Sequence, residues 1–320
     1  MQPCAIRHRG LSLSMQNQVN HFYMLKLLPL KAVVIALLLL SIFSCNKFEG
    51  DQTVPAYIKI DTIRLSTEYF SQGSNTHKIT DAWVYVNDQL IGAFELPVTV
   101  PVLARGKQKL EIRPGIKLNG ISGTRVPYPF YKPYTVQDFN FIQDSVIKIN
   151  PVTSYYNTTG FAWMEDFEGA SISLAKTPQS DTSIYQTTPL NNPEAYLSEF
   201  SSFSGIVNLT SEKSYFKIAS FNAFILPTDN SPVMLELDYK CDRTFGVGMF
   251  ASISGSVVDI ELVVVNKSET WNKIYINLGP NISAYNKASN FKIYFESSTS
   301  GDNEANYYFD NIKLIYRSNK

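Results

Sequence analysis

The chain has 320 residues, of which 44% are apolar, and its 28 Lys and Arg are balanced by 28 Asp and Glu. Without net charge or a basic cluster, it lacks the electrostatic footprint that nucleic-acid binding requires. Three Cys and three His leave few ligands for a zinc site. The length suffices for two modest domains.

The first predicted element is an apolar segment near the N-terminus. Lys26 and Lys31 precede an uncharged run over residues 32–43, and Ser44 and Cys45 follow it. A positive stretch, an apolar stretch and a small residue are the order of a secretory signal. The final four letters, IFSC, resemble the cleavage box of a bacterial lipoprotein, which implies cleavage before Cys45 and a lipid on its sulfur. The alternative is a retained membrane anchor, but the run is shorter than the roughly 20 residues that a spanning helix needs.

The lipoprotein resemblance also implies a location. Asn46 follows the cysteine instead of Asp, which favours the bacterial outer membrane over the inner one; the surface and the periplasmic side both stay open. Residues 45–55 are predicted to be the lipidated cysteine and a short polar tether. Residues 1–44 combine this signal with an upstream extension and are left out of the predicted fold; the true start is Met1, Met15 or Met24.

After the tether, short alternating runs separated by Gly, Pro, Asn and Asp predict an all-β protein. The first block, residues 56–150, holds several such runs, and residues 87–89 supply a tight turn between two of them. The phrase over residues 84–115 resembles small surface β-domains of the PEGA type. We therefore predict a small β-sandwich, PEGA-like or Ig-like, and the resemblance implies an interaction or spacer module without catalytic residues.

Two segments near the end of this block are distinctive. Residues 126–134 read VPYPFYKPY, in which prolines alternate with aromatic residues, so the segment is extended or turning and does not form a ladder strand. It is either a rigid aromatic surface for a ligand or a loop that covers the sandwich edge, and we favour the loop. Residues 151–160 are predicted to be the linker, with Tyr155 and Tyr156 at an interdomain seam.

The second block, residues 161–320, carries three phrases in order. They are WMEDFEG at 163–169, WNKIYINL at 271–278 and YYFDNIKL at 307–314. Together they resemble the jelly-roll sandwich of carbohydrate-binding modules and galactose-binding-like domains. The overall prediction is an all-β chain with two antiparallel β-sandwich domains after a lipoprotein signal, the second being a jelly roll.

The same resemblance implies a structural calcium ion. In those families the Glu of the opening phrase and the Asp of the last strand often bind calcium, and the matching positions are Glu168 and Asp310. Calcium takes 6–8 oxygen ligands, so carboxylates from distant strands suit it. The alternative is that both are surface or turn acids that accept hydrogen bonds.

Sugar binding would need exposed aromatic faces beside polar groups. The candidates are Trp163, Tyr185, Tyr196, Trp271 and Tyr285. Trp163 and Trp271 sit inside strand phrases and are expected to face the core. Tyr185, Tyr196 and Tyr285 are therefore the predicted ligand-binding residues.

Catalytic residues are not predicted. His77 is the one histidine beyond the signal and lies in a polar loop, so we expect a solvated side chain. Three functions compete: a non-catalytic lipoprotein that binds glycans or another surface ligand, a structural or assembly lipoprotein that docks an envelope protein, and a carboxylate-based glycoside hydrolase. The hydrolase would need two carboxyl groups about 5–9.5 Å apart in one cleft.

Overall fold

A computed structural model describes residues 54–198, 201–300 and 303–318. Residues 55–320 form one compact unit. The predicted signal, the predicted lipidation site Cys45 and the predicted tether up to residue 53 lie outside the described residues. Within the described ranges, no helix is long and apolar enough to cross a membrane.

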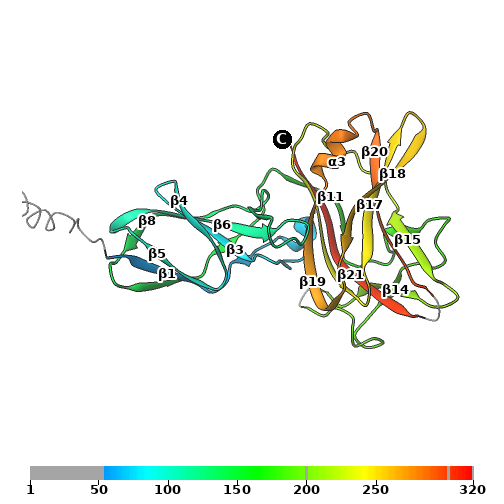
Figure 1. Cartoon of the computed structure of the whole chain (residues 1–320), viewed down its shortest axis with the longest axis horizontal. Helices are drawn as coiled ribbons and strands as arrows, with labels where there is room; N and C mark the ends of the chain where they lie inside the picture. The colour runs from blue at the N-terminus through cyan, green and yellow to red at the C-terminus, as the bar shows by residue number, and fades with distance from the viewer. Residues whose placement is uncertain (1–53, 199–200, 301–302, 319–320) are drawn as a thin grey trace, which may run out of the picture. The chain divides into compact units, whose positions relative to one another are not determined.

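The N-terminal part of this unit is a β-sandwich (Figure 1). One sheet has the strand order β5-β1-β9, the other has the order β4-β3-β6-β7 with β8 on β6, and β10 pairs with β2. The pairs β1–β9 and β10–β2 are parallel, whereas the other pairs of these sheets are antiparallel. The elements are β1 (Ala56–Ile60), β2 (Arg64–Leu65), α2 (Tyr69–Gln72), β3 (Asp81–Val86), β4 (Gln89–Glu95), β5 (Val98–Val102), β6 (Gly106–Lys117), β7 (Arg125–Pro127), β8 (Tyr134–Phe141), β9 (Val146–Ile149) and β10 (Val152–Thr153).

The predicted turn between β3 and β4 is present. Asn87 and Asp88 have positive φ angles of 48° and 65°, which matches the tight hairpin turns that Asn and Asp favour. Between the sheets, apolar side chains alternate inward from the strands, among them Ile58, Val84 and Ile112, all with 0% exposure. The alternation that the sequence shows is therefore the core face of this sandwich.

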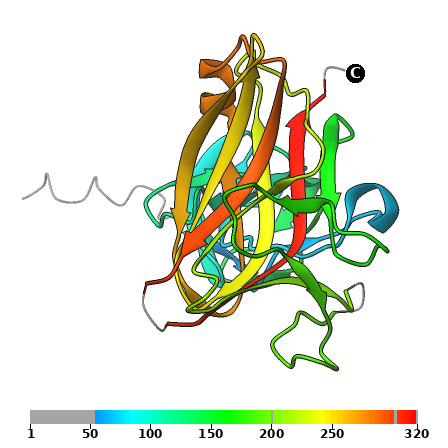
Figure 2. The ribbon, with the colours of Figure 1, turned by 90° about the vertical axis from the view of Figure 1, so that its right-hand side faces the viewer.

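The C-terminal part is a larger antiparallel sandwich (Figures 1 and 2). Its six-stranded sheet runs β13-β14-β21-β16-β19 with β11 on β21, and its five-stranded sheet runs β12-β15-β20-β17-β18. The elements are β11 (Thr159–Glu165), β12 (Leu174–Lys176), β13 (Tyr185–Thr187), β14 (Ser204–Leu209), β15 (Tyr215–Ser220), β16 (Val233–Cys241), β17 (Phe245–Ile253), β18 (Ser256–Val265), β19 (Ser268–Asn277), α3 (Gly279–Ala284), β20 (Asn290–Ser298) and β21 (Ala305–Arg317). The predicted fold class, all-β with two sandwiches, is confirmed.

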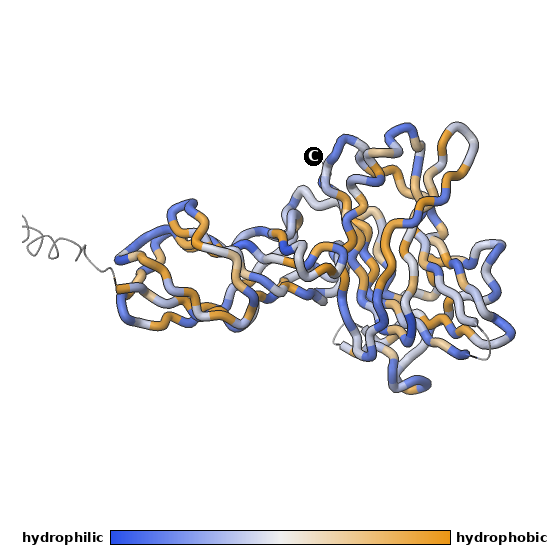
Figure 3. The backbone as a smooth tube through the Cα atoms, in the orientation of Figure 1, coloured by the Kyte–Doolittle hydropathy of each residue, from blue (hydrophilic) through white to orange (hydrophobic). Residues whose placement is uncertain are grey.

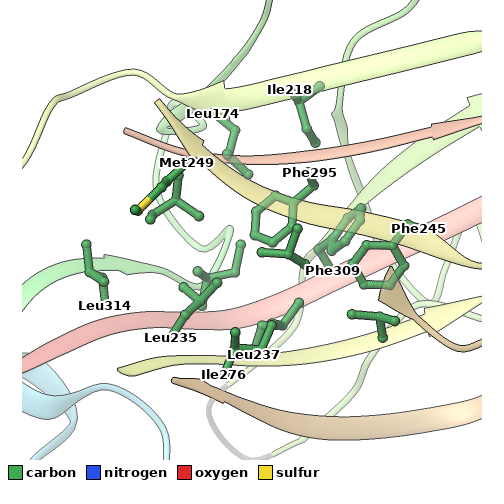
Figure 4. Close-up of a cluster of buried hydrophobic side chains, with 14 of the residues drawn as sticks. Leu174, Ile218, Leu235, Leu237, Phe245, Met249, Ile276, Phe295, Phe309 and Leu314 are labelled. Carbon is green, nitrogen blue, oxygen red and sulfur yellow. The ribbon is translucent and has the colours of Figure 1, made fainter. Parts of the chain in front are cut away.

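The core of this sandwich lies between the two sheets. Leu235 and Leu237 of β16 and Phe309 of β21 face Met249 of β17 and Phe295 of β20 (Figure 4). Along the strands hydrophobic residues dominate, and hydrophilic residues gather in the loops (Figure 3). Each fully buried Leu, Phe or Met contributes about 1.5–3 kcal/mol, so packing can stabilise the sandwich; Cys241, the cysteine within the described ranges, is free.

The two distinctive segments both lie between the sandwiches. In the proline-rich segment, Tyr128, Phe130 and Tyr131 are at most 2% exposed. They are therefore packing residues, which agrees with a covering loop and not with an exposed aromatic surface. Residues 151–160 contain β10 and the start of β11, and Tyr155 is 1% exposed. These aromatic residues of the two segments are therefore part of a hydrophobic core.

Candidate functional site

The outer face of the six-stranded sheet carries buried charges. Leu235 and Leu237 of β16 point into the core, so the alternation of a strand turns Glu236 and Asp238 to the opposite face. Glu236 is 0% exposed and Asp238 is 4% exposed. Neighbouring strands add three more buried charged residues to this region, Lys273, Asp310 and Lys313. We call these five residues the charged cluster.

The centre of the charged cluster is fully hydrogen-bonded. The hydroxyls of Tyr128 and Tyr155 donate to Glu236 Oε1 at 2.7 and 3.0 Å. Lys273 Nζ lies 3.3 Å from Asp238 Oδ1 and 3.8 Å from Glu236 Oε2. Buried charges are tolerated when they are paired and hydrogen-bonded in this way. A tyrosine of the first block and a tyrosine of the 151–160 segment therefore cover Glu236 on the outer face of the six-stranded sheet.

Burial shifts the pKa values of two further members of the charged cluster. Burial lowers the pKa of Lys313 from its ordinary value of 10.5 to about 7, although its Nζ donates to Ser74 O at 2.6 Å. Burial also raises the pKa of Asp310 well above its ordinary value, while the Ser201 hydroxyl, which donates to Oδ2 at 2.6 Å, opposes that shift. The cost of desolvation therefore dominates at both groups.

The stability of the protein is expected to increase with pH because of Lys313. The folded state releases the proton of this lysine near pH 7, whereas an unfolded lysine keeps it until about pH 10.4. Between these values the unfolded state binds more protons, so the free energy of unfolding rises with pH. We expect a rise of about 2 kcal/mol between about pH 7 and 9 from this group.

Urea denaturation at several pH values measures this rise. The matched variant is Lys313→Met, which is expected to flatten the profile over the same interval. The interval ends near pH 9 because burial raises the pKa of the Cys241 thiol to about 11, and that shift lowers stability once an unfolded thiol ionises. Equal slopes for the two proteins would contradict the assignment to Lys313.

A hollow of about 700 Å³ lies beside the charged cluster. It is lined by residues 75–78, by part of β19, and by Tyr196, Ser198 and Asp238. The backbone N–H of Lys78 donates to the hydroxyl of Tyr275 at 2.9 Å, which ties the 75–78 loop to β19. Segments almost two hundred residues apart in the chain thus contribute to one lining.

Two aromatic rings form one wall of the hollow. The ring centroids of Tyr196 and Trp271 are 5.0 Å apart in an edge-on arrangement. Trp271 Nε1 donates to the carbonyl of Glu194 at 2.9 Å, and its ring lies 6.2 Å from that of Tyr308. Because its N–H is satisfied and neighbours hold it on two sides, the Trp271 ring is fixed in place before any ligand arrives.

Polar groups complete the lining. His77 Nδ1 lies 3.0 Å from the carbonyl of Asn75, so this nitrogen carries the proton and donates it. The ammonium of Lys78 is hydrogen-bonded to Asn272 Oδ1. Asp238 is the only carboxylate among the described residues of the lining, so this hollow does not present the carboxylate pair that a glycosidase uses. The arrangement can offer an aromatic surface and hydrogen bonds to a polar ligand.

The structure places the predicted ligand residues at different sites. Tyr196 lines the hollow. Tyr185 lies on β13 with 54% exposure, and Tyr285 follows α3 and packs against the core, so neither joins Tyr196. Trp163 is buried as expected. The expectation that Trp271 faces the core is wrong, because the alternation of β19 directs Ile274 and Ile276 inward and Trp271 outward.

The 75–78 loop contributes residues to the hollow that no sequence motif indicates. His77 was expected to be a solvated loop residue, and it is a part of the lining together with Lys78. Nothing in the local sequence connects this loop to β19, because the connection is a tertiary contact. The one local feature of this loop is a group of polar residues between two predicted strands, and such a group does not by itself indicate a binding site.

The two predicted calcium ligands hold the same segment of chain. Glu168 Oε1 accepts hydrogen bonds from the backbone N–H groups of Ser202 and Phe203, both at 2.7 Å. Asp310 accepts one from Ser201. Over the ranges that the structure covers, no group of three or more His, Cys, Asp or Glu side chains is placed to hold a metal ion. These oxygens are already hydrogen-bonded without an ion, and the calcium site stays a prediction.

Metal removal tests that prediction. If calcium bridges Glu168 and Asp310, a chelator is expected to lower the thermal midpoint of the wild-type protein, because bound metal stabilises only the folded state. Glu168→Gln keeps an acceptor for the two N–H groups but weakens calcium binding, so its midpoint should no longer respond. A wild-type midpoint that is unchanged by the chelator would leave hydrogen bonding as the role of both carboxylates.

Comparisons with known proteins give a fold likeness only. No protein-family model matches the chain, and no curated protein matches it either. Among solved structures, a carbohydrate-binding module of the β-sandwich superfamily is 12% identical with a TM-score of 0.37, over 73% of this chain and 84% of that one. A family 11 carbohydrate-binding module from Clostridium thermocellum, in complex with a β-1,3-1,4-mixed-linked tetrasaccharide, is 13% identical with a TM-score of 0.33, over 49% and 94%.

A third structure is a cyclase from Fischerella sp. TAU, which is 12% identical with a TM-score of 0.36, over 51% of this chain and 100% of that one. At such TM-scores and identities the likeness carries no argument about a ligand or an activity. A shared fold does not fix a function, so the function has to be argued from the hollow itself.

Proposed function

We propose that this protein is a non-catalytic lipoprotein of the bacterial outer membrane that binds a glycan in the hollow beside Trp271. The single observation that carries the proposal is the fixed pair of Trp271 and Tyr196 in a lining that is otherwise polar. A sugar ring has an apolar face that packs on an aromatic ring, and its hydroxyls need hydrogen-bond partners. Aromatic rings with nearby polar groups supply both.

The size and the rigidity of the hollow support the proposal. A volume of about 700 Å³ lies within the range of small-molecule sites, which is about 300–1,000 Å³. The N–H of Trp271 is already used by Glu194, so the ring can be held without rearrangement when a ligand packs on it. Binding groups that are already fixed lose less conformational entropy on association. This helps to bind a ligand that forms only weak individual contacts, such as an oligosaccharide.

A glycan array tests the proposal directly. The purified chain from residue 46 onward is applied to arrayed neutral and acidic glycans, and binding to a defined subset is expected. Uniformly blank spots would contradict glycan binding and favour the assembly role, in which the lipoprotein docks an envelope protein.

The lipid anchor is tested separately. Cells that express the full chain are labelled with a palmitate analogue, and label is expected on the wild-type protein in the outer-membrane fraction. Cys45→Ser removes the sulfur that would carry the lipid and should abolish the label, whereas Cys241→Ser, which alters the buried thiol, should retain it. An unlabelled wild-type protein in the cytosol would overturn this part of the proposal.

A further inference from the structure

The charges around the hollow do not cancel. Asp238, its carboxylate, is paired with Lys273 at 3.3 Å and accepts a hydrogen bond from Asn311 at 3.0 Å. Lys273 is in turn shared with Glu236. Asp238 and Lys273 therefore already have an oppositely charged partner without a ligand.

Lys78 is different. Its hydrogen-bond partner is the neutral amide oxygen of Asn272, and among the described residues no Asp or Glu lies within ion-pair distance of it. Burial and the nearby charge of Lys117 both lower its pKa. The position thus holds a positive charge that the protein itself does not balance.

The place of this charge is fixed by the fold. The Lys78 N–H bonds Tyr275 at 2.9 Å, and its side chain bonds Asn272 on the same strand, next to Trp271. The adjacent His77 adds an imidazole to the same lining. An ammonium without a counter-ion therefore lines the same hollow as the aromatic pair.

We propose that the glycan recognised in this hollow is acidic, with a carboxylate or sulfate group that pairs with Lys78 while a sugar ring packs on Trp271. This inference rests on the proposed function, since it names the class of ligand for the same site. An anionic group would supply the missing counter-charge of Lys78. Hydrogen bonds that involve a charged group are about twice as strong as neutral ones, so the acid group would dominate selectivity between related sugars.

The test uses an array that presents neutral glycans beside counterparts that carry a uronic acid or a sulfate ester. We expect the acidic member of a bound pair to bind about tenfold more tightly, which corresponds to about 1.4 kcal/mol. Its advantage should shrink as sodium chloride is raised from about 0.05 M to about 0.5 M, since salt screens a partly exposed charge pair. Separate uronate and sulfate pairs identify which anion is preferred.

Variants assign the preference to a residue. Lys78→Gln is expected to bind the acidic and the neutral member of a pair equally. Lys287→Gln removes the same charge from an exposed position in the second block, outside the lining, and should keep the preference. Thermal midpoints of both variants check that each one is folded.

The outcomes separate the two proposals. Equal binding of acidic and neutral members by the wild-type protein, or an acid preference that survives in Lys78→Gln, overturns the acidic ligand and leaves glycan binding in place. An array on which nothing binds overturns both proposals.

Discussion

Replacing Glu236 with alanine is expected to lower the free energy of unfolding by about 3–5 kcal/mol, the range found when one partner of a buried ion pair is removed. Glu236 is 0% exposed and accepts hydrogen bonds from Tyr128 and Tyr155. Its loss leaves two buried hydroxyls without their acceptor and removes a counter-charge from Lys273. Urea denaturation at neutral pH measures the change.

A matched control separates this effect from the loss of any glutamate. Glu269 lies on β19 with a side chain that is 88% exposed, so Glu269→Ala should change stability by no more than about 0.5 kcal/mol. Tyr155→Phe, which removes only a donor to Glu236, should fall between the two. Similar stabilities for Glu236→Ala and Glu269→Ala would show that the charged cluster does not hold the sandwiches together.

Replacing Trp271 with alanine is expected to weaken glycan binding at least about 30-fold, because truncation of a central aromatic contact commonly costs 2 kcal/mol or more. The substitution removes the ring and frees Tyr196 from its edge-on neighbour. Titration calorimetry with a glycan found on the array measures the change. Tyr196→Ala should weaken binding as well, since it removes the other ring of the pair.

Tyr185→Ala is the matched control for Trp271→Ala. Tyr185 is an exposed aromatic residue of the same sandwich that does not line the hollow, so its removal should leave the affinity unchanged. Near-ultraviolet circular dichroism confirms that each variant is folded. If Tyr185→Ala weakened binding and Trp271→Ala did not, the ligand site would have to be sought near β13.

The sequence predicts the sandwiches because their periodicity is local. In residues 235–239 apolar and polar side chains alternate, and the structure turns Leu235 and Leu237 into the core as that pattern indicates. Alternation cannot show what covers the other face. Glu236 looks like a solvent-facing residue of a strand, and it is fully buried because tyrosines from another part of the chain close over it.

The candidate site was predictable only in part for the same reason. Tyr196 stood out as an aromatic residue beside a loop, and it does line the hollow. Trp271 was expected to be in the core, since a tryptophan in a strand phrase is usually buried. Trp271 instead lies on the outer face of β19, beside the loop that contains His77 and Lys78. This contact between distant segments forms only in the folded chain, so the sequence near Trp271 does not show it.

The hollow is shared between the two sandwiches, and this limits how the protein can be recombined. Its lining joins the 75–78 loop of the first block to β19 of the second. A chimaera that exchanges either sandwich for a relative would replace one part of the lining and leave the other part unmatched. Exchange of a whole sandwich is therefore expected to preserve binding only if the retained part of the lining is also changed, so this protein should behave in domain shuffling as one inherited block.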